Sequence, residues 1–163
     1  TVGLVNGDPH QATLQAWYAC LQAMTVPCTI SSAIQVDIWK KLVWNVPFNS
    51  LSVLHGGVST DVLVHDPDIC QHARHIMQDV CRVAQADGVV LPEDIIDVTI
   101  DRTKNMAPYH TSMCLDYLHH RPLEVDPIVG AVCRVAAQHH CEVPYVDTLY
   151  QELLNVPTTI PQT

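Results

Sequence analysis

The chain has 163 residues, 48% of them hydrophobic and 15% charged, which allows one domain with a substantial core and argues against two full domains. The net charge of -9, from 8 basic and 17 acidic residues, argues against nucleic acid as a partner, because such proteins normally carry a basic patch. The longest apolar runs are shorter than a bilayer span and no signal peptide is recognisable, so we expect no membrane partner.

The seven cysteines show no C-x-x-C spacing. An odd number without that spacing indicates neither a disulfide framework nor a zinc knuckle. Most of the cysteines fall within apolar helical patterns, where a free thiol behaves as a small hydrophobic group. We therefore expect reduced, structural thiols in a cytoplasmic protein.

The first 32 residues predict one strand–helix unit. Residues 1–9 are typical of a short strand and a turn, and 11–24 show apolar residues at helical spacing. Residues 25–32 contain Pro27 and several β-branched or serine residues, which predicts an extended linker. Because an isolated strand and helix cannot form a stable layer, we expect residues 1–32 to be the end of a neighbouring sheet domain.

Residues 33–163 favour helices almost throughout. Asp66 followed by Pro67 predicts a capped helix start, and Gly88 predicts the end of that helix. Further helix starts are expected at Leu91–Pro92–Glu93, Asp126–Pro127 and Val143–Pro144. The predicted fold is therefore mostly α, preceded by a residual strand–helix piece.

A polar stripe is the first candidate site. Lys41, Asn45 and Asn49 lie four residues apart, so a helix places them on one face. Asparagine is a poor residue for a helix interior, and Pro47 between the two amides is expected to kink the helix. Large apolar residues surround the stripe: Trp39, Leu42, Val43, Trp44 and Phe48. A proton donor and two amides in an apolar wall suit a small, oxygen-rich ligand, whereas the alternative is a solvated helix face.

A second group of polar residues follows at Ser112, Asp116 and Glu124. Taken singly, Ser112 is typical of a helix N-cap and Glu124 of a surface charge. Together with the stripe they form a set of motifs: W-x-K-L-x-x-N-x-x-x-N over 39–49, S-M-x-x-D over 112–116 and R-P-x-E over 121–124. This set resembles the C-terminal domain of the ketopantoate reductase (2-dehydropantoate 2-reductase) family, and the resemblance covers nearly the whole chain.

The resemblance implies a helical domain of the 6-phosphogluconate dehydrogenase C-terminal-like type and an NADP(H)-dependent oxidoreductase of pantothenate biosynthesis. It implies that Lys41 is catalytic and protonates the ketone oxygen of a small 2-keto acid as hydride arrives from NADPH. Glu124 would be catalytic too, fixing the lysine and keeping it protonated. Asn45, Asn49 and Ser112 would bind the substrate. The family also makes a homodimer possible.

The chain departs from the family pattern in two ways. Among its six glycines no G-x-G-x-x-G occurs, so we expect the cofactor site upstream of Thr1, on the protein's own N-terminal Rossmann domain. This chain alone is then expected to be inactive. Family members often have Gly where His120 stands and near His140. The sequence alone therefore does not predict the backbone geometry of the turns at these two histidines.

Two other functions compete with the reductase hypothesis. The same helical fold without a cofactor would be a non-catalytic binding or oligomerisation module. His72, His75 and Asp79 share one helical face at ligand-like spacing, which would suit a metal. We favour no metal there, because no convincing fourth ligand is present and these residues are expected on the solvent side.

Overall fold

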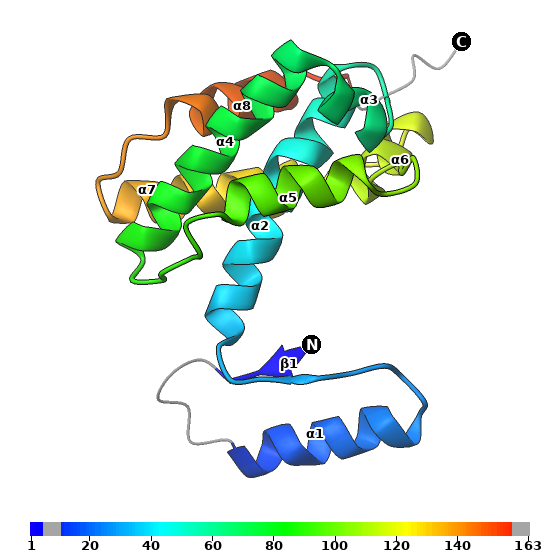
Figure 1. Cartoon of the computed structure of the whole chain (residues 1–163), viewed down its shortest axis with the longest axis vertical. Coiled ribbons are helices and arrows are strands. Elements are labelled where there is room, and N and C mark those ends of the chain that lie inside the picture. The colour runs from blue at the N-terminus through cyan, green and yellow to red at the C-terminus, as the bar shows by residue number, and fades with distance from the viewer. Residues whose placement is uncertain (5–10, 158–163) are drawn as a thin grey trace.

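The computed structural model describes residues 1–4 and 11–157, and within these it is mostly helical, as the sequence predicts. Figure 1 shows a bundle of helices at one end and a small strand–helix unit at the other, joined by one long helix. The turn predicted at residues 7–9 lies outside the described residues. No helix in the described ranges is long and apolar enough to cross a membrane.

The strand–helix unit contains β1 (Val2–Gly3), α1 (Gln11–Ala23) and β2 (Ile30–Ser31). The strands are parallel, with Val2 opposite Ile30 and Gly3 opposite Ser31. The linker predicted over 25–32 is therefore partly wrong, because its end pairs as a strand. Two residues are too few to show period-two alternation, so only their distant partner reveals them.

Helix α2 (Ile34–Leu54) is the central element of the bundle. Every residue from Val46 to Val53 is buried, which is typical of a helix covered on all sides. Helices α4 (Pro67–Ala86) and α8 (Pro144–Leu154) pack against it. Pro47 lies inside α2 and the helix continues through it.

Helices α3 (Thr60–His65), α5 (Ile95–Lys104) and α6 (Ser112–Leu118) follow the core helix. The predicted cap at the start of α4 is confirmed, because Asp66 accepts hydrogen bonds from the Asp68 and Ile69 amides. Gly88 follows the end of α4 with a φ of 80°, as predicted. Helix α5 begins later than expected, because the residues after Pro92 first form a turn in which Ile95 donates to the Pro92 carbonyl.

The helix predicted at Asp126 begins as a short π-helix, η1 (Asp126–Gly130), and continues as α7 (Ala131–Gln138). A Cβ on Gly130 would lie 2.5 Å from the Asp126 Oδ1 atom and 3.1 Å from the Tyr150 ring. This close approach allows the Asp126 carboxylate to accept hydrogen bonds from Arg134, at 2.7 Å, and from Tyr150, at 2.9 Å. The widened turn is therefore held by side chains of three elements.

Asp79 is not on the solvent side of α4, contrary to the expectation from the sequence. Its carboxylate is 1% exposed and accepts hydrogen bonds from the Tyr145 and Val146 amides at the start of α8 and from Arg82. The His75 ring instead stacks on Tyr145, with 4.6 Å between the ring centroids. In the ranges that the structure describes, no group of three or more His, Cys, Asp or Glu side chains could hold a metal ion.

Candidate functional site

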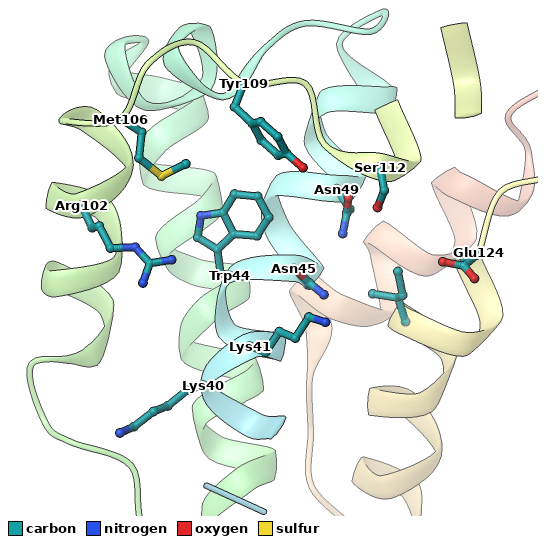
Figure 2. A pocket seen from close by; sticks show the side chains of 11 residues that line it. Lys40, Lys41, Trp44, Asn45, Asn49, Arg102, Met106, Tyr109, Ser112 and Glu124 are labelled. Carbon is teal, nitrogen blue, oxygen red and sulfur yellow. The ribbon is translucent and has the colours of Figure 1, made fainter. Parts of the chain in front are cut away.

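A cavity of about 740 Å³ opens on one side of the bundle, where α2, α5, α6 and η1 meet (Figure 2). Its lining residues are Lys40, Lys41, Trp44, Asn45, Asn49, Arg102, Met106, Tyr109, Ser112, Glu124 and Ile128. All five residues that the sequence singled out belong to this lining. Its volume lies in the usual range of ligand-binding pockets.

The polar stripe of α2 forms one wall of the cavity, as its helical spacing predicts. Burial increases along the stripe: Lys41 is exposed, Asn45 is half-buried and Asn49 is 2% exposed. Figure 2 shows the Lys41 amine close to the Asn45 amide, with Asn49 further in toward Ser112. The stripe therefore places an exposed cation at one end and a buried amide at the other.

The buried amide of Asn49 has an unsatisfied acceptor. In the described part of the chain, three buried side-chain oxygens lack a hydrogen-bond partner: Asn49 Oδ1, Ser50 Oγ and Thr60 Oγ1. Asn49 is the one among them that lines the cavity. Because leaving a buried acceptor unpaired costs about 1–3 kcal/mol, a ligand that donates a hydrogen bond here recovers that free energy.

Ser112 reaches the cavity because its neighbour caps the helix. The sequence suggested Ser112 as a possible N-cap of α6, but Thr111 fills that position and accepts a hydrogen bond of 3.1 Å from the Cys114 amide. The Thr111 hydroxyl also shares a hydrogen bond with Ser52 of α2, which fixes the start of α6 against the core. The Ser112 side chain is exposed and available to a ligand.

Glu124 lies on the wall opposite the stripe, just before η1, and its side chain is exposed (Figure 2). The loop leading to it is held by an ion pair of 2.9 Å between Arg121 and Asp116. Across the described ranges, no ion pair within 4.0 Å joins Glu124 to Lys41. The two charged groups therefore line the same cavity without pairing with each other.

An aromatic side completes the cavity. The Trp44 ring lies 5.3 Å from Phe48 and 6.3 Å from Tyr109, measured between centroids, and its indole N–H donates to the Thr103 hydroxyl at 3.1 Å. Of the five apolar residues that the sequence placed around the stripe, Trp44 alone lines the cavity. The others face different sides of the helix, and Trp39, Val43 and Phe48 belong to the core.

Sequence reasoning missed five lining residues: Lys40, Arg102, Met106, Tyr109 and Ile128. Lys40 is exposed and also borders the cavity. Tyr109 could have been suspected from its position three residues before Ser112. Arg102 and Met106 belong to no motif, and only the packing of α5 beside α2 brings them to the site.

Residues 33–156 match the family described as Ketopantoate reductase PanE/ApbA C terminal. A 2-dehydropantoate 2-reductase of Nostoc sp. is 39% identical over 115 residues, which cover 71% of this chain and 36% of that protein. One of Vibrio cholerae is 28% identical over 132 residues, covering 78% of this chain and 43% of that protein. The chain thus spans less than half the length of these curated relatives.

Solved structures agree with this match. The 2-dehydropantoate 2-reductase of Methylococcus capsulatus is 31% identical, with a TM-score of 0.80 over 95% of this chain and 49% of that one. A dimeric ketopantoate reductase of Staphylococcus aureus is 32% identical, with a TM-score of 0.80 over 88% of this chain and 50% of that one. These similarities place the chain in a class of oxidoreductases. It belongs to the ketopantoate reductase family and corresponds to that family's C-terminal domain.

Proposed function

We propose that the chain supplies the substrate-binding and proton-donating part of an NADP(H)-dependent 2-dehydropantoate 2-reductase, or of a close paralogue that reduces another small 2-keto acid. The observation that carries the proposal is the cavity in which Lys41, Asn45, Asn49, Ser112 and Glu124 meet. Membership of the family supports the reaction class.

Lys41 is the proposed proton donor. Reduction of a ketone builds negative charge on its oxygen, and a positioned ammonium group both stabilises that charge and delivers the proton. The amide of Asn45 lies beside the lysine and would orient it, while the unpaired Asn49 Oδ1 atom would accept a hydrogen bond from a substrate hydroxyl. The Ser112 hydroxyl would donate to the substrate carboxylate.

Glu124 is proposed to bind across the substrate from Lys41. Its carboxylate would stabilise the positive charge of the lysine and accept a hydrogen bond from the substrate, once the ligand fills the space between the walls. The separation of Glu124 from Lys41 in this structure supports this arrangement, since a direct ion pair would occupy the position of the substrate.

We propose that the nicotinamide end of the cofactor also enters the cavity, and its volume of about 740 Å³, larger than a small keto acid needs, supports this. The apolar lining residues Trp44, Met106 and Ile128 are the ones that would hold that ring. The reduced nicotinamide supplies the hydride when it is bound. We propose that residues 1–32 belong to the Rossmann domain that binds the rest of the cofactor, and that the protein works as a homodimer in the cytoplasm.

Substitution of Lys41 tests this function. In the protein as its gene encodes it, oxidation of NADPH is followed with ketopantoate and with a panel of other 2-keto acids. The Lys41→Ala variant is expected to lose about a hundredfold to ten-thousandfold in kcat, the usual contribution of general acid catalysis. Lys41→Arg keeps the charge but donates a proton poorly, so it should lose activity as well.

Lys104→Ala is the matched control, because this lysine lies on the neighbouring helix outside the cavity. Its activity should equal that of the unsubstituted protein. Unchanged turnover in Lys41→Ala would sink the assignment. A folded protein that oxidises no NADPH with any 2-keto acid would instead support the non-catalytic alternative.

A further inference from the structure

The positive charges of this acidic protein are unevenly distributed. It has 8 lysines and arginines against 17 aspartates and glutamates, so most basic groups should find a carboxylate. Four of the five arginines do so within 2.9 Å: Arg74 with Asp97, Arg82 with Asp79, Arg121 with Asp116 and Arg134 with Asp126. Among the described residues, Arg102 is the arginine without such a partner.

The basic groups that lack a carboxylate within 4.0 Å, within the described ranges, are Arg102 and the three lysines, Lys40, Lys41 and Lys104. Three of these four line the cavity, whose lining contains a single carboxylate, that of Glu124. A hollow with an excess of positive charge on an otherwise negative protein concentrates the field and attracts anions. One cation, Lys41, is already assigned to the ketone oxygen.

Arg102 stands on the far side of Trp44 from the glutamate. Figure 2 shows its guanidinium group directed from α5 toward the indole, while Ser112 and Glu124 lie on the opposite side of the cavity. The neighbouring Thr103 fixes the indole, because its hydroxyl accepts from Trp44 at 3.1 Å and donates to the Thr99 carbonyl at 2.7 Å. The indole toward which Arg102 is directed is therefore held in place by α5.

The position of Arg102 in the last turn of α5 also suits the helix dipole. Lys104 lies in the same turn and satisfies the same dipole, but it does not line the cavity. The dipole therefore accounts for a basic residue at this helix end and does not account for an unpaired arginine directed into a cavity. A guanidinium group is the side chain best shaped to bind a carboxylate or a phosphate with two parallel hydrogen bonds.

We propose that Arg102 forms a second anion-binding subsite at the Trp44 end of the cavity. Its ligand is a carboxylate or phosphate group of a molecule that also occupies the Lys41 end. Such a group has two possible sources, a second carboxylate on the 2-keto acid or a phosphate of the cofactor. The proposal rests on the proposed function for this assignment alone, since anion binding itself is measured without turnover.

The test is calorimetric titration of the chain at low ionic strength with three probes. They are 2-oxoglutarate, which has two carboxylates, 2-oxobutyrate, which has one, and inorganic pyrophosphate. The Arg102→Gln variant is expected to bind one of the two multiply charged anions, 2-oxoglutarate or pyrophosphate, about tenfold more weakly, as the loss of a charge-assisted hydrogen-bonded pair implies. Its affinity for 2-oxobutyrate should be unchanged, because that ligand needs the Lys41 end alone.

Lys104→Gln is the matched control, since it removes the same charge from the same helix turn. It should weaken the binding of 2-oxoglutarate and of pyrophosphate by less than about twofold, as expected for a distant surface charge. A loss confined to 2-oxoglutarate assigns the subsite to the substrate, and a loss confined to pyrophosphate assigns it to the cofactor. Equal losses in the two variants, or no loss in Arg102→Gln, would overturn the proposal.

The indole N–H signal of Trp44 in the proton NMR spectrum gives a second readout, because this group lies beside the subsite and donates to Thr103. The signal should shift when the anion that occupies the subsite, 2-oxoglutarate or pyrophosphate, is added. The shift should be much smaller in Arg102→Gln. A shift of the same size in that variant would also contradict the proposal. If Lys41→Ala retains full turnover while Arg102→Gln shows the expected loss, the proposed function fails and the subsite stands.

Discussion

At the scale of single residues, two histidines adopt a conformation that normally belongs to glycine. His120 and His140 have φ angles of 54° and 52°, and each follows the last residues of a helix. Both helices end with the two backbone hydrogen bonds that are typical of a C-terminal cap in the left-handed conformation. At the end of α6, for example, the Arg121 amide donates to the Asp116 carbonyl at 2.8 Å. The glycine that the family resemblance leads us to expect at the position of His120 would therefore have a conformational reason, and this chain keeps the turn with histidine.

Replacement of these histidines by glycine is expected to stabilise the protein. A side chain in the left-handed region costs about 1–2 kcal/mol, while glycine loses part of this gain to its greater freedom in the unfolded chain. His120→Gly and His140→Gly should each raise the free energy of unfolding by about 0.5–1 kcal/mol, measured by urea denaturation. His119→Gly is the control, because His119 has a φ of -96°. No advantage of His120→Gly over this control would contradict the interpretation.

At the scale of elements, the π-helix η1 depends on one carboxylate. The Arg134 guanidinium, and then the Tyr150 hydroxyl, hold the pKa of Asp126 below its ordinary value by hydrogen bonding to the charged form. The same contact with Asp126 raises the pKa of Tyr150. Because η1 follows Glu124 and carries Ile128, both of which line the cavity, this network shapes one wall of the candidate site.

The Asp126 network should make stability depend on pH in the acid range. Since the pKa of Asp126 is lower in the folded state, its contribution is complete above the unfolded value of about 4 and is lost as the pH falls through the folded value. Urea unfolding at a series of pH values should show Asp126→Asn less stable than the unsubstituted protein near neutrality. The difference should shrink below about pH 4. A difference that stays constant down to the lowest pH would show that the carboxylate charge has no part in holding η1.

The sequence predicted those elements whose signals are local. Helix starts at Asp66 and Pro144 were correct because a cap or a proline marks them within a few residues. The strand β2 and the π-turn of η1 were missed, because each depends on a partner distant in the sequence: β1 for the strand, and Tyr150 for the turn.

The same distinction applies to the candidate site. The polar stripe was predicted because its spacing is a property of one helix, and all three of its residues line the cavity. The burial of Asp79 was not predicted, since the groups that donate hydrogen bonds to its carboxylate include backbone amides of a helix that begins 65 residues later. Arg102 was not predicted, because the role proposed for it rests on its place in the cavity and on the lack of a carboxylate partner among the described residues, and neither belongs to a sequence motif.

At the scale of the whole molecule, the chain consists of two unequal parts. The buried core lies almost entirely in the helical bundle, from Trp39 to Leu153. The strand–helix unit lies at the other end of α2, away from the bundle (Figure 1). Large apolar side chains are exposed in α1 and just after it, with Trp17 63% exposed and Met24 64% exposed. A two-stranded sheet with one helix cannot bury these side chains by itself, which supports the proposal that residues 1–32 belong to a larger nucleotide-binding layer.

The two parts should therefore differ in stability, and a shortened chain tests this. A protein made of residues 33–163 keeps the whole core and loses close contacts such as that between Gly3 and Ile34. Its thermal unfolding is expected to stay cooperative, with a midpoint within about 3 °C of that of the longer chain, because little buried apolar surface is removed. In the longer chain, hydrogen exchange should be fast in α1 and slow in the buried part of α2. A midpoint lowered by more than about 8 °C would show that the unit stabilises the bundle, and the boundary at residue 33 would then be wrong.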